Sequence, residues 1–237
     1  GNVSLPPTIA VHAVFDHHQS AGAKNRSYFS DIRPQTGATS TIITEYLLEA
    51  RCPISPRLAT ALFYGIKTDT ADFSRPFSDL DLTCYKHLFD ILDHEILAKV
   101  QNPDRDLDYF RTLSRSLQSA EIFETIGYSH TGRVTTPDVI AEMTDLFQSL
   151  DSLEWMICTG VFKSNLFFSI RSKDKPQAGK TAEKIARLLG GNGGGHGKVA
   201  AGRIPFDDGE AETVRNEFIK TMKAVFRITL EEGDSIL

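Results

Sequence analysis

The sequence predicts an α/β protein of two domains, the first with a parallel sheet and the second a smaller α/β domain with a mixed sheet. Residues Ile9 to Phe15 read IAVHAVF, a short β-branched apolar run typical of strands buried in parallel sheets. Beyond Thr125, strand patterns and helix patterns alternate. We place the boundary inside the preceding helical stretch, so the predicted domains span residues 1–115 and 116–237.

The N-terminal domain continues after this strand with a polar loop and a series of helices. Ser55 and Pro56 are an N-cap and a first-turn signal, and the apolar face that follows runs up to Thr68. Asp69 therefore lies at or beyond a helix end. The predicted helices cover residues 38–51, 56–68, 79–97 and 105–125.

The C-terminal domain is predicted to alternate between strands and helices. A turn at Ser164 and Asn165 joins two strands as a hairpin. The predicted strands cover residues 126–128, 154–163, 166–172 and 199–204. The predicted helices begin at Pro137, at Gly179 and at Glu210, and a glycine loop covers residues 190–197.

Composition and charge exclude several classes of protein. With 237 residues, 41% of them hydrophobic and 24% charged, the chain has the composition of a folded globular protein. Lys and Arg number 26 against 31 Asp and Glu, and this net charge of -5 argues against a protein that coats duplex nucleic acid. Three cysteines without a C-x-x-C pair fit the reducing cytoplasm. No apolar run approaches the roughly 20 residues that span a bilayer, so we expect no membrane partner.

The first candidate site is the triplet Asp16-His17-His18, directly after the predicted strand. Ligands bind at the carboxyl ends of strands in open α/β sheets. Imidazole and carboxylate groups together suit divalent cations such as Mn²⁺, Mg²⁺ or Zn²⁺. The alternative interpretation is a polar turn that follows a strand.

The second candidate is the block from Gly65 to Phe73, in which Thr68 and Thr70 flank Asp69 and could orient its carboxylate. The alternative is an ordinary helix C-terminus, where an acidic residue is slightly unfavourable because of the helix dipole. A bound cation would remove that penalty.

The third candidate is the stretch GGNGGGHG over residues 190–197, together with Arg171 at the end of a predicted strand. Glycines allow backbone N–H groups to approach a phosphate closely, and a guanidinium binds phosphate through two hydrogen bonds. The order helix, glycines, strand is the reverse of a dinucleotide-binding fingerprint, so a Rossmann fold is rejected. The alternatives are a flexible loop and a surface arginine.

In their order and spacing, these motifs resemble the DHH phosphoesterase family. The C-terminal stretches Ser169-Ile170-Arg171-Ser172, Gly193-Gly194-Gly195-His196 and Ala200-Ala201-Gly202 narrow the resemblance to the branch with a DHH-associated domain. That branch includes oligoribonucleases, adenosine bisphosphate phosphatases and RecJ-type exonucleases. The resemblance implies that residues 1–115 are the C-terminal part of a catalytic domain with a linker helix, and that 116–237 bind the substrate.

The resemblance also implies a two-metal hydrolytic site for Mn²⁺ or Mg²⁺. Paired cations generate hydroxide near neutral pH and stabilise both the attacking and the leaving oxygen. The residues that it assigns are Asp16, His17 and Asp69 as metal ligands, His17, His18 and Asp69 as catalytic groups, and Arg171, Gly194, Gly195 and His196 as the substrate-phosphate site.

Three features depart from the family pattern. Two motifs that supply metal ligands should precede the D-H-H triplet, yet only 15 residues precede Asp16. Asn192 interrupts the glycines, and three residues separate His196 from Ala200 where two are expected. We therefore expect a C-terminal part of a longer enzyme. Because missing strands would expose sheet edges and faces, we also expect that the chain forms a homodimer or packs unusual apolar surface.

The leading hypothesis is a metal-dependent phosphoesterase that acts on short single-stranded oligonucleotides or small nucleotides such as adenosine bisphosphate. One alternative is a nucleotide-binding module that lacks hydrolytic activity because its metal site is incomplete. Another is a polyphosphate or pyrophosphate hydrolase with the same fold.

Overall fold

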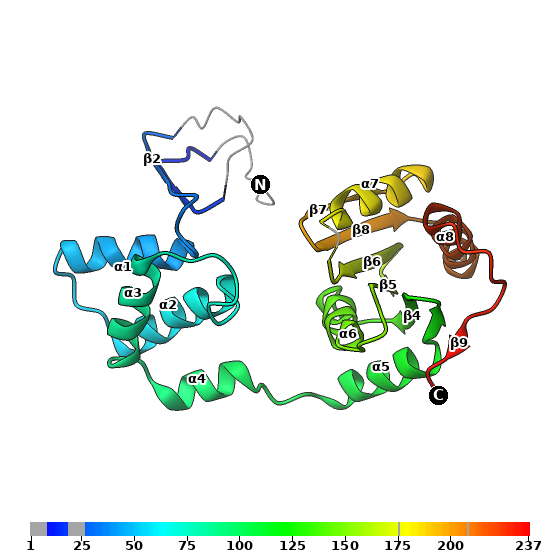
Figure 1. The fold of residues 1–237 in the computed structure, drawn as a ribbon, viewed down its shortest axis with the longest axis horizontal. Coiled ribbons are helices and arrows are strands. Elements are labelled where there is room, and N and C mark those ends of the chain that lie inside the picture. Colours follow the sequence, from blue (N-terminus) through cyan, green and yellow to red (C-terminus); the bar gives the residue numbers. More distant parts are fainter. Residues whose placement is uncertain (1–8, 19–26, 175, 208) are drawn as a thin grey trace. The chain divides into compact units, whose positions relative to one another are not determined.

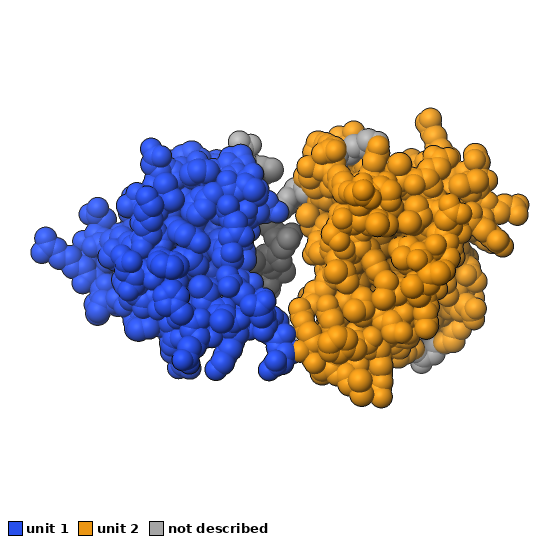
Figure 2. Space-filling view, turned by 60° about the horizontal axis from the view of Figure 1, so that its bottom comes forward, with its two compact units in different colours: residues 1–104 blue, residues 105–237 orange. Residues whose placement is uncertain are grey.

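The chain folds into two compact units (Figures 1 and 2). The structure, a computed structural model, describes residues 9–18, 27–174, 176–207 and 209–237. Unit 1 comprises residues 1–104 and unit 2 comprises residues 105–237. The boundary predicted after residue 115 falls inside a helix of unit 2, because that helix is tied to the neighbouring strand: Ser129 Oγ donates to Ser116 O at 2.8 Å.

The described residues of unit 1 form a two-stranded parallel sheet and four helices (Figure 1). Its elements are β1 (Ala13–Asp16), β2 (Phe29–Ile32), α1 (Thr39–Glu49), α2 (Pro56–Asp69), α3 (Asp79–Phe89) and α4 (His94–Gln101). The parallel pairing of Ala13 with Phe29 confirms a parallel sheet in the first domain. Strand β2 was not predicted, because its four residues lie within the polar loop.

The helix predicted over residues 79–97 is wrong in one respect, since the structure divides it into α3 and α4. Asp93 begins the second helix, and its carboxylate accepts hydrogen bonds from Glu95 N and Ile96 N at 3.0 Å. An N-cap aspartate satisfies backbone donors that a continuous helix would bond internally. The chain therefore starts a new helix there.

Unit 1 is held together by a helical core and by one buried carboxylate. Apolar side chains of its four helices pack around Phe63, Ile66 and Leu88, which are almost fully buried. Asp81 in the first turn of α3 is also completely buried. Asp81 and Ser78 form a capping box, so the helix start is specified locally.

Unit 2 is built on a seven-stranded mixed sheet with the strand order β7-β8-β6-β5-β4-β3-β9. Strands β4 and β5 are parallel, and every other neighbouring pair is antiparallel. The strands are β3 (Glu121–Phe123), β4 (Ile126–Arg133), β5 (Trp155–Phe162), β6 (Asn165–Ser172), β7 (Asn192–His196), β8 (Val199–Pro205) and β9 (Asp234–Ser235). The helices are α5 (Leu107–Gln118), α6 (Asp138–Gln148), α7 (Ala178–Leu188) and α8 (Ala211–Phe226). The fold class is confirmed, and the predicted helix over 105–125 is corrected because β3 follows α5.

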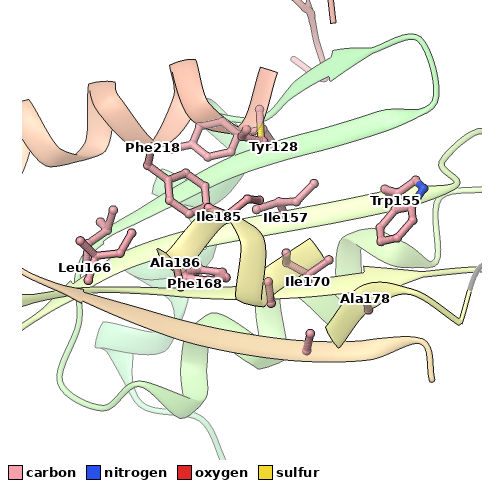
Figure 3. Close-up of a cluster of buried hydrophobic side chains, with 14 of the residues drawn as sticks. Tyr128, Trp155, Ile157, Leu166, Phe168, Ile170, Ala178, Ile185, Ala186 and Phe218 are labelled. Atoms are coloured by element: carbon pink, nitrogen blue, oxygen red, sulfur yellow. The ribbon is translucent and has the colours of Figure 1, made fainter. Parts of the chain in front are cut away.

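Both faces of this sheet carry a hydrophobic core. On one face, Tyr128, Phe168 and Phe218 lie in the cluster that α7 and α8 cover (Figure 3). On the other face, Met143 of α6 packs with Met156 of β5 among side chains that also come from α5. Because side chains alternate along a strand, Ile170 belongs to the first face and Arg171 to the second. No described helix of either unit is both long and apolar enough to cross a membrane.

The predicted glycine loop is instead the edge strand β7, continued by a turn into β8. A Cβ on Gly193 would lie 2.7 Å from Ala182 O in α7, and one on Gly195 would lie 2.2 Å from Val199 O. Glycine therefore lets this strand approach its neighbours closely. A run with almost no side chains gives no strand pattern to read from the sequence.

Candidate functional site

The D-H-H triplet lies at the carboxyl end of β1, as predicted from the sequence. Asp16 ends the strand, and its Oδ1 accepts hydrogen bonds from His18 N at 3.0 Å and from His18 Nδ1 at 2.8 Å. Burial raises the pKa of Asp16, but the hydrogen bonds from His18 outweigh burial, so this pKa lies below its usual value. Asp16 is therefore ionised near neutral pH and holds His18 in place.

His17 points toward Asp69, which lies more than fifty residues further along the chain. His17 Nε2 is 3.7 Å from Asp69 Oδ2, and the His17 side chain is 17% exposed. On its other side, His17 Nδ1 is 3.3 Å from the carbonyl oxygen of Thr36. The backbone of Thr36 thus fixes the ring, and Nε2 is left facing the carboxylate. The structure brings the first two predicted motifs together.

Asp69 is the last residue of α2, and a strained turn follows it at once. Ala71, Asp72 and Phe73 have φ angles of 46°, 53° and 62°, in the left-handed region that non-glycine residues rarely adopt. Hydrogen bonds hold this turn, among them Asp72 N to Lys67 O at 2.9 Å. Strain of this kind is concentrated at functional sites.

The two threonines beside Asp69 do not orient its carboxylate as the sequence suggested. Thr68 Oγ1 donates to Tyr64 O at 2.9 Å, and Thr70 Oγ1 donates to Ile66 O at 2.7 Å. Both hydroxyls therefore bond to the backbone of their own helix. They shape the end of α2, and the carboxylate of Asp69 is 44% exposed.

Sequence analysis missed the residues that support His17, namely Thr36 and Asp81. The buried carboxylate of Asp81 accepts hydrogen bonds from Gly37 N at 2.8 Å, from Thr41 Oγ1 at 2.5 Å and from Ser78. Burial raises the pKa of Asp81, but the hydrogen bonds have the larger, opposite effect. The pKa therefore lies below its usual value, and the carboxylate stays ionised. It ties α3 to the loop that carries Thr36. The Ser78-x-x-Asp81 capping pattern was the available signal.

The donor set fits part of a cation site. A metal-bound histidine commonly has its other ring nitrogen at a backbone carbonyl, which is the arrangement of His17 and Thr36. Ligands of one cation at about 2.1 Å each can lie up to roughly 4 Å apart, so the separation of His17 and Asp69 is compatible with a shared ion. Among the residues that the structure describes, no three His, Cys, Asp or Glu side chains converge to hold an ion.

Arg171 lies on the α6 side of the unit 2 sheet and is already paired. Its Nε and Nη2 donate to the two carboxylate oxygens of Asp145 at 2.5 and 3.1 Å, and its Nη1 donates to Ser169 Oγ at 2.9 Å. The Arg171 side chain is 13% exposed, whereas Asp145 is 61% exposed. The guanidinium is therefore fixed between α6 and its own strand. Asp145 was not predicted, because it comes from a helix 26 residues earlier.

Gly194 is a glycine that the fold itself does not require. A Cβ added there would meet no atom within 4 Å, and its φ is not positive. Each other described glycine either has a positive φ or would place its Cβ against a neighbouring atom. Gly194 lies in register with Ala201 and Ser169, so its bare side belongs to the face that carries Arg171. This pattern is typical of a backbone that a ligand approaches closely.

The backbone of His196 lies in the strand row of Val199 and Arg171, two residues beyond Gly194. The side chain of His196 falls outside the described part of the structure. Gly195 points to the opposite face, toward Ala200. The predicted substrate residues therefore share neighbouring strands, and Gly194 and Arg171 share one face.

The comparisons with known proteins bear on both units of this α/β fold. Residues 124–227 match the DHHA1 domain family. These residues lie within unit 2, and the match confirms the predicted resemblance to the DHH branch with this associated domain.

Among known proteins, an uncharacterized protein of Methanocaldococcus jannaschii is 27% identical over 223 residues, which cover 94% of this chain and 45% of that protein. The chain thus spans less than half the length of that relative. An exopolyphosphatase-related protein from Bacteroides fragilis shares the fold, with a TM-score of 0.70 and 14% identity over 90% of this chain and 64% of that one. A pGpG-specific phosphodiesterase from Vibrio cholerae aligns at a TM-score of 0.43 and 17% identity over 93% of this chain and 82% of that one.

Proposed function

We propose that the protein is a divalent-metal-dependent phosphoesterase that hydrolyses short oligonucleotides or small phosphorylated nucleotides. The observation that carries the proposal is the approach of His17 Nε2 to Asp69 Oδ2 at 3.7 Å. Two motifs far apart in the sequence meet there, at the carboxyl end of a parallel strand. The match of unit 2 to a DHHA1 domain supports the same function.

In this proposal, His17 and Asp69 hold a Mn²⁺ or Mg²⁺ ion of a two-metal site. When bound, such an ion lowers the pKa of a water molecule and supplies hydroxide near neutral pH. The carbonyl oxygen of Thr36 accepts a hydrogen bond from His17 Nδ1, which orients Nε2 to act as a ligand. Asp16 is a further ligand, and its hydrogen bonds to His18 keep both groups at the site.

Substrate binding is assigned to unit 2. Arg171 binds a phosphate group, and the bare backbone at Gly194 lets that group or the adjoining sugar lie against the sheet. Gly195 and His196 extend the same strand. Asp145 and Ser169 hold the guanidinium in place before substrate arrives, which limits the entropy lost on binding.

The test is hydrolysis of adenosine bisphosphate, di- to tetranucleotides and pyrophosphate in the presence of Mn²⁺. We expect turnover of the nucleotides by the full chain and a loss of at least about 100-fold in His17→Ala. His87→Ala is the matched control, because His87 is an exposed histidine of unit 1 on α3. Equal activity of the two variants would refute the assignment of His17.

A second candidate function is nucleotide binding without hydrolysis. It is favoured by one observation, that no three metal-ligating side chains converge among the described residues. Absence of turnover, together with nucleotide binding that Arg171→Gln abolishes, would establish this alternative. Preferred hydrolysis of pyrophosphate would instead favour the polyphosphate class.

A further inference from the structure

Three rows of residues cross strands β6, β8 and β7 on the face that carries Arg171. The first row, at the predicted phosphate site, is Arg171, Val199 and the backbone of His196. The second is Ser169, Ala201 and Gly194, and the third is Phe167, Arg203 and Asn192. Paired residues of adjacent strands place their side chains on the same face, so all three rows belong to one surface.

The middle row of this surface is bare. Ala201 and Gly194 are exposed and carry at most a methyl group, and a Cβ on Gly194 would meet nothing within 4 Å. Val199 beside them is 40% exposed. The surface therefore has an apolar patch with only small side chains between the first and third rows, on which a sugar or a base can lie.

The third row has the chemistry of nucleotide recognition, yet nothing above assigns it a role. Arg203 is exposed and supplies a guanidinium, which binds phosphate through two hydrogen bonds. Asn192 is exposed in register with it and supplies an amide. Phe167, the third member, is partly buried, and its ring packs against Phe162 with the ring centroids 6.1 Å apart, so it closes this end of the surface. Asn192 is also the residue that interrupts the glycines of β7.

The two arginines of the surface differ in their charge balance. Asp145 neutralises Arg171 through a bidentate ion pair. Among the described residues, no carboxylate forms an ion pair with Arg203. The exposed guanidinium of Arg203 supplies a positive charge at the surface that attracts a phosphate.

We propose that Arg203 and Asn192 form a second substrate-binding position that takes a phosphate of a linear nucleotide, one step along the chain from the phosphate held by Arg171. Arg203 lies four positions along β8 from Val199, which is about 13 Å at the usual rise of a strand. With side chains reaching inward from both rows, the surface suits a substrate with two separated phosphates. This inference rests on the proposed function and narrows its substrate class to dinucleotides and longer strands over mononucleotides.

The test is isothermal titration of the full chain with two probes, the 5′-phosphorylated dinucleotide pApA and the mononucleotide AMP. We expect Arg203→Gln to weaken binding of pApA about tenfold, as loss of one phosphate contact does, and to leave AMP within twofold. Asn192→Ala should weaken pApA by a smaller factor of the same sign. Arg187→Gln is the control, since Arg187 is an exposed arginine of α7, which packs on the opposite face.

An equal loss for AMP and pApA, or no loss for pApA, would overturn the second position. Thermal unfolding, followed by the fluorescence of Trp155, the single tryptophan of the chain, checks that each variant is folded. Failure of the proposed hydrolytic function gives a different result from failure of the second position. If Arg171→Gln and Arg203→Gln both weaken pApA but no probe is hydrolysed, the second position stands and the hydrolytic activity does not. If the dinucleotide is hydrolysed and Arg203→Gln binds it normally, only the second position is lost.

Discussion

The sheets of the two units carry their sites in different ways. In unit 2, seven of the eight residues of β5 are buried, because helices cover both faces of the sheet. In unit 1, no residue of β1 or β2 is fully buried, and the nearby side chains of Tyr28 and Phe29 are 87% and 45% exposed. Strands of parallel sheets are usually covered on both faces.

This difference shows where each site obtains its rigidity. The proposed substrate surface of unit 2 lies on a seven-stranded sheet with a core on each face, and its geometry follows from strand register. The His17 and Asp69 pair of unit 1 lies at the end of a short sheet, and its geometry depends on helices and on the buried carboxylate of Asp81. Packing should therefore dominate the stability of unit 2, and hydrogen bonding should dominate the order of the unit 1 site.

The largest expected effect is on the unit 2 core. Phe218 is fully buried, with its ring centroid 5.1 Å from that of Phe168, so Phe218→Ala should lower the free energy of unfolding by about 3–5 kcal/mol. Trp155 fluorescence measures this loss, and hydrogen exchange should show unchanged protection in α2 of unit 1. Phe110→Ala, at a side chain that is 56% exposed, is the control. Loss of protection in both units together would contradict their separate cores.

The next effect is a dependence of unit 2 stability on pH. Burial, with the nearby charges of Arg215 and Arg115, lowers the pKa of His130 to about 4. Because the unfolded chain takes up this proton near pH 6.5 and the folded chain only near pH 4, stability is full above pH 6.5 and falls as the pH is lowered to 4. A shift of this size corresponds to about 3 kcal/mol.

Replacing this histidine tests the assignment of that pH dependence. In His130→Gln, the midpoint of unfolding, measured by Trp155 fluorescence, should depend less on pH between 6.5 and 4. The reason is that glutamine has no proton to gain. His87→Gln, at an exposed histidine, should leave the dependence unchanged. A slope that persists in His130→Gln would show that other groups cause it.

A smaller effect is expected in unit 1. Asp81→Asn places an amide against donors from Gly37, Thr41 and Ser78, and should lower the stability of unit 1 by about 1–3 kcal/mol. Hydrogen exchange of the segment around Thr36 should then rise, and hydrolysis should lose kcat more than KM. Asp79→Asn, at an exposed position in the same helix turn, is the control. Unchanged exchange in Asp81→Asn would show that the loop does not depend on this carboxylate.

Sequence patterns predicted much of the fold because the relevant signals are local. The helix start at Ser55 lies where its short pattern places it. The hairpin predicted with a turn at Ser164 and Asn165 is present, but the turn is one residue earlier, at Lys163 and Ser164. Strand β7 escaped prediction because glycines carry no alternation, and its pairing is set by close approach to α7.

The candidate site was predictable only as separate motifs. The resemblance to a family placed His17, Asp69 and Arg171 in functional roles, and the structure adds their partners Thr36 and Asp145. Those partners act through a backbone carbonyl and through a contact between a helix and a distant strand. Neither kind of contact can be predicted from a short stretch of sequence.

The left-handed turn over residues 71–73 also bears on how this protein would respond to selection. Each such residue costs of order 1–3 kcal/mol, and the rest of unit 1 must offset that cost. A library screened only for survival on heating would therefore favour glycine at these positions, where the conformation is free of strain. The proteins recovered would be more robust, and they would hold the carboxylate of Asp69 less firmly.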